Sequence, residues 1–306
     1  MCLAGAVAGF TERFVARDGV RLRVVEAGRR GDPPVVLAHG FPDLALGWRH
    51  QIAALAAAGY HVLAPDQRGY GRSSCPEQVA AYDIHALTGD LVGVLDALTD
   101  ARRAVFVGHD WGATVVWSLT LLHPDRVAGT VGLSVPPVPR ALVAPTEAFA
   151  KFGPDFYILH FQRPGVADAE LGADPAATVA MMFGSLAGPP GDWLEPEVFD
   201  EYVAEFTRTG YTGGLNWYRN FDRNWARTPE LAGATFDTPA LFIVGSADPT
   251  AGFLRTDRAR QVAVGRYEEL VIDGAGHWLA QERPAEGTAA LLDFLRWPQL
   301  RQWRTG

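Results

Sequence analysis

Short apolar runs alternate with longer stretches of helical periodicity along most of the chain. Strands are predicted where β-branched and other apolar residues follow one another closely, at residues 21–28, 33–39, 61–66, 104–108, 127–134, 239–248 and 267–273. Helices are predicted where Leu, Val and Ala recur at helical spacing, at residues 46–59, 82–99, 113–124 and 253–265. Strands separated by helices are typical of a mostly parallel sheet covered by helices on both faces.

The alternation of strand-like and helix-like stretches stops between about residues 138 and 236. Short β runs are missing there, and aromatic clusters at residues 152–162 and 214–225 stand between Pro and Gly residues. This pattern predicts a mainly helical insertion after about the sixth strand. We therefore expect a core domain of residues 1–137 and 237–306, interrupted by a helical insertion at residues 138–236.

Composition and charge narrow the classes of protein to which the chain can belong. A chain of 306 residues, 48% of them hydrophobic, can bury a sizeable core. The formal net charge is −8 and no basic run occurs, so neither nucleic acid nor an anionic membrane surface is an expected partner. No stretch approaches the roughly 20 apolar residues that cross a bilayer. We expect a small or neutral partner molecule.

Cysteine usage and the start of the chain favour a cytoplasmic location. Only Cys2 and Cys75 are present, so neither a disulfide framework nor a cysteine metal site is expected. Residues 1–10 are apolar but have no positively charged start and no clear cleavage site, which argues against export. The sequence contains no cluster of metal ligands and no phosphate-cradling glycine loop, so no metal or other cofactor is expected.

The first candidate for chemistry is GHDWG, residues 108–112, which stands between a predicted strand and a predicted helix. This context is typical of a nucleophile elbow, a sharp turn in which glycines allow the neighbouring chain to approach closely. The corner residue is Asp110 rather than serine or cysteine. The following helix directs its positive end at this carboxylate and favours its ionised form. The alternative is that Asp110 is only a helix N-cap.

The segment VVLAHGFPD, residues 35–43, supplies a second candidate. The strand ends near His39, and the backbone N–H of Phe41 can then point to the elbow. Together with the N–H of Trp111, the residue after the corner, it would form an oxyanion hole. The alternative is a strand followed by a simple Gly and Pro turn. The sequence leaves open whether Pro42 follows a cis peptide.

Two further candidates follow the last two predicted strands. His277 lies in the glycine-rich loop of GAGHW, where a side chain can be held at the carboxyl edge of the sheet beside the elbow. Asp248, in GSADPT, can orient the imidazole and stabilise its protonated form. Asp273 is too close to His277 along the chain to reach its ring easily. The sequence therefore predicts a triad of Asp110, Asp248 and His277.

The order nucleophile, acid, histidine is that of the α/β-hydrolase fold. With HGFPD, DQRGYGRSS, GHDWGA, FQRPGVADAE, GLNWYRN and GAGHW in succession, the chain resembles the epoxide hydrolases of the α/β-hydrolase superfamily from about Phe14 to Trp297. The resemblance implies an α/β fold in which residues 138–236 form a helical cap, or lid. It also implies a cofactor-independent enzyme that converts an epoxide and water to a vicinal diol through an ester on Asp110.

The resemblance further implies that the insertion supplies two phenols to the opening epoxide. Within the family motifs, FYILHFQRPG aligns Tyr157 and GLNWYRN aligns Tyr218 with these tyrosines. A phenol suits the donation of a proton because it stays protonated near neutral pH. Trp111, Phe156, Phe161 and Trp217 are expected to line an apolar substrate pocket, although aromatic residues that only pack beneath a lid have the same pattern.

Two other functions remain as alternatives. A haloalkane dehalogenase uses the same aspartate nucleophile, but a halide leaves without a proton and needs N–H donors rather than two phenols. A small-molecule-binding protein can retain the triad on the same fold. A serine esterase is excluded at this elbow by Asp110. The sequence leaves open the natural epoxide, its stereochemistry and the oligomeric state, a homodimer included.

Overall fold

The computed structural model describes residues 10–184, 193–252 and 256–305. Residues 1–9, which contain Cys2 and most of the opening segment for which no export signal is expected, lie outside the described residues. Within the described ranges, eight strands form one sheet in the order β1-β2-β4-β3-β5-β6-β7-β8. Their bounds are β1 Thr11–Arg17, β2 Val20–Ala27, β3 Pro34–Ala38, β4 His61–Pro65, β5 Ala104–His109, β6 Val127–Leu133, β7 Ala240–Gly245 and β8 Tyr267–Ile272.

The sheet is parallel from β4 to β8, and β2 pairs with its two neighbours, β1 and β4, in the antiparallel direction. The strand predictions are confirmed, because each predicted run contains one of the strands β2 to β8 or nearly all of it. β1 was missed. Within β1 only Val15 is fully buried, so this edge strand lacks the run of apolar residues that identifies the others.

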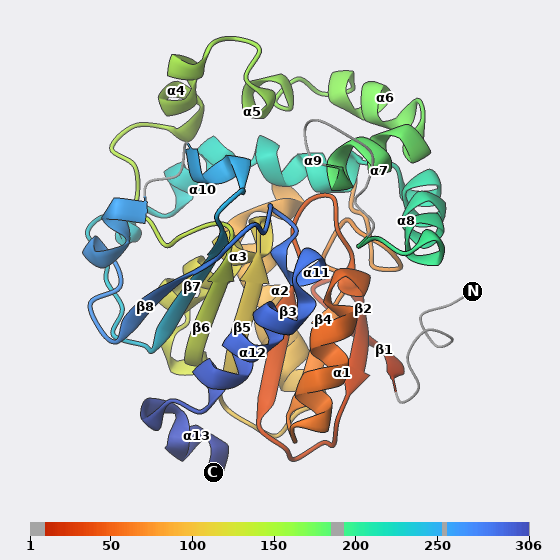
Figure 1. Ribbon diagram of the computed structural model, residues 1–306. Helices are drawn as coiled ribbons and strands as arrows, with labels where there is room; N and C mark the ends of the chain where they lie inside the picture. The colour runs from red at the N-terminus through yellow and green to blue at the C-terminus, as the bar shows by residue number, and fades with distance from the viewer. Residues whose placement is uncertain (1–9, 185–192, 253–255, 306) are drawn as a thin grey trace.

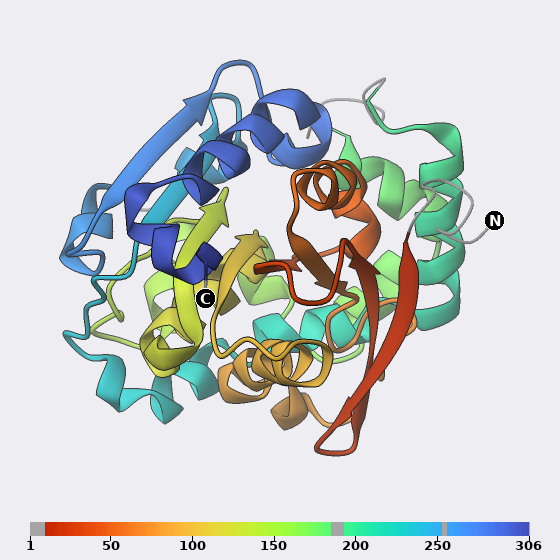
Figure 2. The ribbon, with the colours of Figure 1, turned by 90° about the horizontal axis from the view of Figure 1, so that it is seen from below.

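Helices cover both faces of the sheet. Figure 2 shows α1 (Arg49–Ala57) and α12 (Pro284–Leu295) on one side and α2 (Ile84–Leu98) on the other. α3 (Trp111–Leu122) packs against β5, β6 and α2, while α11 (Leu279–Glu282) packs against α1 and α12. α13 (Arg301–Thr305) lies near the carboxyl end of the chain. Helices on both faces explain why the central strands are buried along their whole length.

One helix prediction was wrong. Residues 253–265 were expected to be helical, but the described part contains only a 3-10 helix, η8, at Thr256–Gln261. The backbone N–H of Phe236 donates to Val262 O, and the Val264 N–H donates to Phe236 O. These two bonds form a parallel bridge between Phe236 and Ala263, which a continuing helix would not allow. Residues 253–255 of the same prediction lie outside the described residues.

Between β6 and β7, the described residues form seven helices in a layer over one edge of the sheet (Figure 1). We call them the upper helical layer: α4 Pro145–Phe149, α5 Tyr157–His160, α6 Val166–Gly172, α7 Pro175–Phe183, α8 Pro196–Thr209, α9 Thr212–Arg219 and α10 Phe221–Arg227. Tyr218 on α9 contacts Phe41 and Trp111, which follow β3 and β5. The layer therefore covers the carboxyl ends of the parallel strands. Two short 3-10 helices also lie between β6 and β7, η5 Ala150–Phe152 and η6 Pro229–Leu231. The others are η2 Ala45–Trp48, η3 Val79–Tyr82, η4 Pro124–Arg126, η7 Pro249–Gly252 and η9 Pro298–Leu300.

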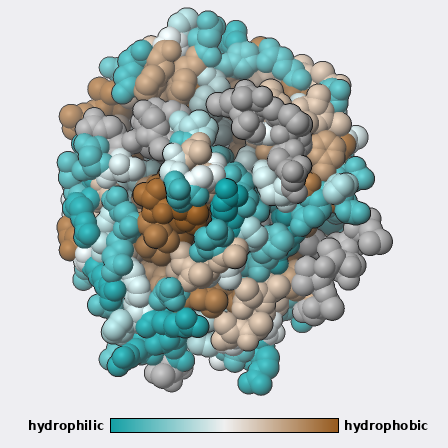
Figure 3. Space-filling view, viewed as in Figure 1, coloured by the Kyte–Doolittle hydropathy of each residue, from teal (hydrophilic) through white to brown (hydrophobic). Residues whose placement is uncertain are grey.

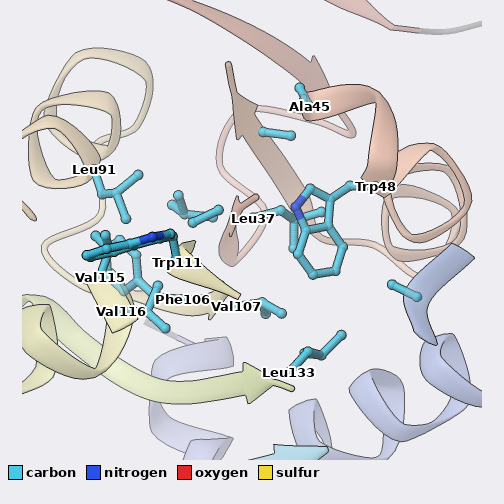
Figure 4. Packing of buried hydrophobic residues seen from close by; sticks show 14 of the residues in the cluster. Leu37, Ala45, Trp48, Leu91, Phe106, Val107, Trp111, Val115, Val116 and Leu133 are labelled. Atoms are coloured by element: carbon cyan, nitrogen blue, oxygen red, sulfur yellow. The ribbon is translucent and has the colours of Figure 1, made fainter. Parts of the chain in front are cut away.

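The main core lies between the sheet and its helices. In Figure 4 the strand residues Leu37, Phe106 and Val107 lie among side chains from the surrounding helices, with Trp111 next to Val115 and Val116. The surface in Figure 3 is a mixture of hydrophilic and apolar residues. Among the described residues, no helix combines the length and apolar character needed to cross a membrane.

Candidate active site

Asp110 stands at a sharp corner between β5 and α3. Its backbone has φ of 53° and ψ of −119°, which is rare for a residue with a side chain. The corner is also crowded: a Cβ on Gly112 would lie 2.0 Å from Ala38 O, and one on Gly108 would lie 2.2 Å from Gly112 O. Although Asp110 holds the N-cap position of α3, its side chain makes no capping hydrogen bond. Its carboxylate is thus not used as a helix cap.

The Asp110 carboxylate faces two other loops. The Phe41 N–H donates to its Oδ1 at 2.9 Å, and its Oδ2 lies 3.7 Å from Nε2 of His277. Trp111 begins α3, where an N–H has no partner within the helix. The Phe41–Pro42 peptide is cis. Burial raises the pKa of Asp110, but the hydrogen bond and charge of His277, with the Phe41 N–H, outweigh it and hold the pKa below its ordinary value.

His277 lies between two carboxylates. Its Nδ1 is 3.2 Å from each oxygen of Asp248, so the predicted pairing is present. Asp248 also accepts hydrogen bonds from the N–H and the hydroxyl of Thr250, each at 2.8 Å. The rival Asp273 instead accepts a hydrogen bond from Ser246. Asp248, and not Asp273, is therefore the acid that pairs with His277.

Charges at the site favour an ion pair. Burial raises the pKa of Asp248, but hydrogen bonding and charge from His277 lower it to about 2. Burial lowers the pKa of His277, yet hydrogen bonds and charges from Asp110 and Asp248 raise it to about 10. An imidazolium between two carboxylates is therefore the form of this site at neutral pH. Removal of either negative charge would lower the pKa of His277.

The loop of His277 is held in place by a second histidine. The backbone carbonyl of His277 lies 2.8 Å from Nε2 of His109 and accepts a hydrogen bond from the Ser134 hydroxyl at 3.0 Å. Burial, assisted by the charge of His277, lowers the pKa of His109 to about 4. His109 is therefore neutral at physiological pH and its Nε2–H donates to the carbonyl. Sequence reasoning missed this residue, although it immediately precedes Asp110.

Tyr157 on α5 and Tyr218 on α9 lie next to each other in the upper helical layer. The ring centroids of Tyr157 and Tyr218 are 6.1 Å apart, and the Tyr218 ring stands edge-on to Phe41 and Trp111 at 5.4 and 5.3 Å. Burial, with the negative charge of Asp110, raises the pKa of both phenols. Tyr218 is 5% exposed and Tyr157 is 39% exposed. Both therefore stay protonated at neutral pH, one inside the site and one at its surface.

The other expected pocket residues lie at different depths. Phe161 is buried and its ring contacts Phe41 and Tyr218, while Phe156 is partly exposed and packs beside Tyr157. Trp217 is fully buried, and its indole N–H donates to Arg68 O at 3.1 Å. The Trp217 ring contacts the Trp111 ring, so it supports the wall of the site.

Sequence reasoning also missed a polar junction beside the site. Asp43 is buried and accepts a hydrogen bond from the Tyr202 hydroxyl on α8. Burial raises the pKa of Asp43 to about 7. A cavity of about 10 Å³, the volume that holds roughly one water molecule, is lined by Asp43, Gly47, Trp48, His109, Trp278, Ala280 and Gln281. The only sequence signal was the position of Asp43 two residues after Phe41, in HGFPD.

No metal site accompanies this arrangement in the part of the chain that the structure describes: no group of three or more His, Cys, Asp and Glu side chains could hold an ion there. A partly buried, ionised aspartate beside an imidazolium and two phenols can attack an electrophilic carbon while a proton is donated to the group that leaves.

Comparison with known proteins identifies the family of the chain. Residues 33–284 match the family described as alpha/beta hydrolase fold, and the chain belongs to that family. It is 60% identical to epoxide hydrolase A of Mycobacterium tuberculosis, over 95% of this chain and 99% of that protein. Within the α/β-hydrolase fold family, the chain belongs to the epoxide hydrolases.

Solved structures that are similar to this chain belong to the same family. Epoxide hydrolase A from Mycobacterium thermoresistibile shares 60% identity and a TM-score of 0.90, covering 94% of this chain and 98% of that one. Potato (Solanum tuberosum) epoxide hydrolase I shares 32% identity and a TM-score of 0.88, covering 94% and 99%. The expected fold class and family are thereby confirmed.

Proposed function

We propose that this epoxide hydrolase opens an apolar epoxide through a covalent ester on Asp110. The observation that carries the proposal is the convergence of three chain segments, with Asp110 at 3.7 Å from His277 and His277 at 3.2 Å from Asp248. Asp110 Oδ1 already accepts the Phe41 N–H, so Oδ2 is the attacking oxygen. A bond forms from Oδ2 to a ring carbon as the carbon–oxygen bond of the epoxide breaks.

The leaving alkoxide needs a proton, and Tyr157 and Tyr218 are positioned to supply it. Both phenols stay protonated because burial raises their pKa. General acids of this kind contribute about 10²- to 10⁴-fold to a rate. A departing halide would need no proton, so two protonated phenols favour an epoxide over a haloalkane. A serine at the corner would form an ether, which water does not cleave, whereas aspartate forms an ester, which it does.

Formation of the ester also prepares the second step. It removes the negative charge of Asp110, one of the two charges that raise the pKa of His277 to about 10. The pKa of the imidazolium then falls, so His277 releases its proton to solvent, and the phenolate left by ring opening regains one; neutral His277, oriented by Asp248, can then take a proton from water. That water attacks the carbonyl carbon of the ester and the oxyanion forms at the N–H groups of Phe41 and Trp111. When the oxyanion collapses, the carbon–oxygen bond to the alcohol breaks, the diol leaves with the proton from His277, and the proton of the Asp110 carboxyl returns to the imidazole.

We propose that residues 138–236 act as a cap on a core of residues 1–137 and 237–306. The upper helical layer carries Tyr157 and Tyr218, so the cap contributes the acids and the core contributes the nucleophile and the base. Trp111 and Phe161 line the substrate site and Phe156 lies at its rim. The aromatic lining supports an apolar epoxide as substrate, with water as the second reactant and no cofactor.

A single turnover in heavy-oxygen water tests the ester. With enzyme in excess over styrene oxide in H₂¹⁸O, the first diol is expected to carry ordinary oxygen, and the label enters the carboxylate of Asp110. Mass spectrometry of the diol and of the peptide containing Asp110 measures both. Labelled diol in the first turnover means direct attack by water and contradicts the ester. Tight binding without turnover would favour a binding protein, and faster halide release from bromoalkanes would favour a dehalogenase.

A further inference from the structure

Two consecutive glycines, Gly213 and Gly214, lie in the first turn of α9, and both are buried. A Cβ on Gly213 would lie 2.3 Å from the backbone oxygen of Gly69. One on Gly214 would lie 2.6 Å from Phe41 Cδ2 and 2.7 Å from the Tyr70 hydroxyl. Glycine weakens a helix relative to alanine, so this sequence is unfavourable for α9 in isolation. It allows the helix to lie directly on two loops of the core.

The glycines are in register with two aromatic residues one turn later. Positions four residues apart lie on the same face of a helix, which pairs Gly213 with Trp217 and Gly214 with Tyr218. The first pair lies on the loop of residues 68–70, where Trp217 bonds to Arg68 O at 3.1 Å. The second pair lies on Phe41, whose ring centroid is 5.4 Å from that of Tyr218. Each of these two contacts of α9 with the core therefore includes a glycine and the aromatic residue one turn later.

These contacts connect α9 to the nucleophile by a short path. The Phe41 ring contacts Tyr218, and the Phe41 N–H donates to Asp110 at 2.9 Å. The Tyr218 ring also contacts Trp111, the residue that follows Asp110. A shift of α9 away from the core thus moves the phenol of Tyr218 relative to Asp110, while Asp248 and His277 belong to loops that follow β7 and β8.

We propose that Gly213 and Gly214 are positioning residues that set the distance between the Tyr218 phenol and Asp110. The proposal rests on the function proposed above, in which Tyr218 donates to the opening epoxide. The three atoms nearest to a methyl group on Gly213 all belong to the backbone of Gly69, so this group displaces α9 without pressing on Phe41. A methyl group on Gly214 also displaces Phe41, whose N–H belongs to the oxyanion hole.

The test separates ester formation from ester hydrolysis by rapid-quench mass spectrometry with styrene oxide. Gly213→Ala is expected to slow ester formation about 10- to 100-fold, as small misplacements of catalytic groups do, and to leave ester hydrolysis nearly unchanged. Gly214→Ala is expected to slow both steps. In a Tyr218→Phe background, Gly213→Ala should slow ester formation no further, because its effect acts through that phenol.

Controls distinguish positioning from a general loss of structure. Gly172→Ala in α6 adds a methyl group where no atom lies within 4 Å, and it should change neither step. Trp217→Phe removes the bond to Arg68 O without adding bulk, and should slow ester formation in the same direction if Gly213→Ala does not fold. Equal slowing of both steps by Gly213→Ala, in both backgrounds, would overturn the proposal.

Failure of the two proposals can be told apart. If Tyr218→Phe slows ester formation but Gly213→Ala does not, the positioning role is wrong and the role of Tyr218 stands. If Tyr218→Phe leaves ester formation unchanged, the role of Tyr218 is wrong, and the positioning role fails with it.

Discussion

At the scale of single residues, the environment of Asp110 decides what its carboxylate does. One oxygen accepts the Phe41 N–H and the other faces His277, so the charge is stabilised without a capping bond to α3. An ionised carboxylate held in this way is a weak base and an available nucleophile. Asp43 has the same side chain, but burial raises its pKa to about 7, and it bonds to Tyr202 instead.

Replacing His277 should separate the two chemical steps. In His277→Gln, Asp110 can still attack, but no base activates water, so the ester accumulates. Intact-protein mass spectrometry after addition of styrene oxide is expected to detect one adduct per chain, with turnover reduced by about 10³-fold or more. Asp110→Asn is the matched control and should form no adduct. Normal turnover by His277→Gln would contradict the assigned base.

The raised pKa of His277 also predicts a change of stability with pH. Its folded pKa of about 10 exceeds the ordinary value of 6.5, so its stabilising contribution is complete below pH 6.5 and is lost as pH rises through 10. The difference in unfolding free energy between wild type and His277→Gln should shrink over this range, by up to about 1.4 kcal/mol per pH unit. Urea denaturation at several pH values measures it. A constant difference would contradict the ion pair.

At the scale of elements, buried strands and the loops after them could be predicted from sequence. Continuous apolar runs identify β3, β5 and β6, and the rule that parallel strands end at one edge brings Asp248 and His277 together. β1 could not be predicted in this way, because Phe14 is 42% exposed and covered by the Arg21 guanidinium rather than by the core.

Contacts between distant segments could not be predicted from the sequence pattern. The hydrogen bond between Tyr202 and Asp43 joins residues 159 positions apart, and neither residue carries a local signal for the other. Tyr157 and Tyr218 were selected by resemblance to a family, since the packing of the upper helical layer does not follow from helical periodicity. Periodicity identifies a buried face, but it does not identify the partner of that face.

The elbow between β5 and α3 should be intolerant of any added side chain. Gly112→Ala places a methyl group 2.0 Å from Ala38 O, so the turn must open or β3 must move. We expect the unfolding free energy to fall by about 3 kcal/mol or more, or no folded protein at all, because overpacking a rigid core costs about 1–3 kcal/mol and occasionally more. Thermal unfolding measures the loss. Gly172→Ala, with open space around it, is the control and should be neutral or slightly stabilising.

At the scale of the whole molecule, the core and the upper helical layer are joined by polar contacts as well as by aromatic rings. Tyr202 donates to Asp43, and Arg49 on α1 bonds to Glu195, which precedes α8, at 2.6 Å. Both contacts lie away from the two tyrosines of the site. These contacts hold the α8 side of the layer against the core. α9 instead lies directly on the core at Gly213 and Gly214, and Trp217 bonds to Arg68 O.

Tyr202→Phe tests the contribution of this junction. Loss of the hydroxyl leaves the buried Asp43 with one donor fewer, which should lower the unfolding free energy by about 1–3 kcal/mol. The loss should be larger at pH 8 than at pH 5, because the pKa of Asp43 is about 7 and the charged form depends more on its donors. Tyr70→Phe is the control, since its hydroxyl has no hydrogen-bond partner among the described residues. Equal losses in both variants would contradict the junction.

The place where the upper helical layer leaves the sheet has a consequence for evolution. The layer begins after β6 and returns at β7, and these strands are hydrogen-bonded neighbours, with Leu133 opposite Ile243. Because β6 and β7 run parallel, the chain leaves at the carboxyl end of β6 and, after the layer, must return to the amino end of β7 before the sheet continues. The helices between these two points lie outside the sheet, so they can be lengthened, shortened or exchanged while the sheet keeps its register. The part of the lining that the layer supplies, with Tyr157, Phe161 and Tyr218, can thus vary without a change in the loops that follow β5, β7 and β8.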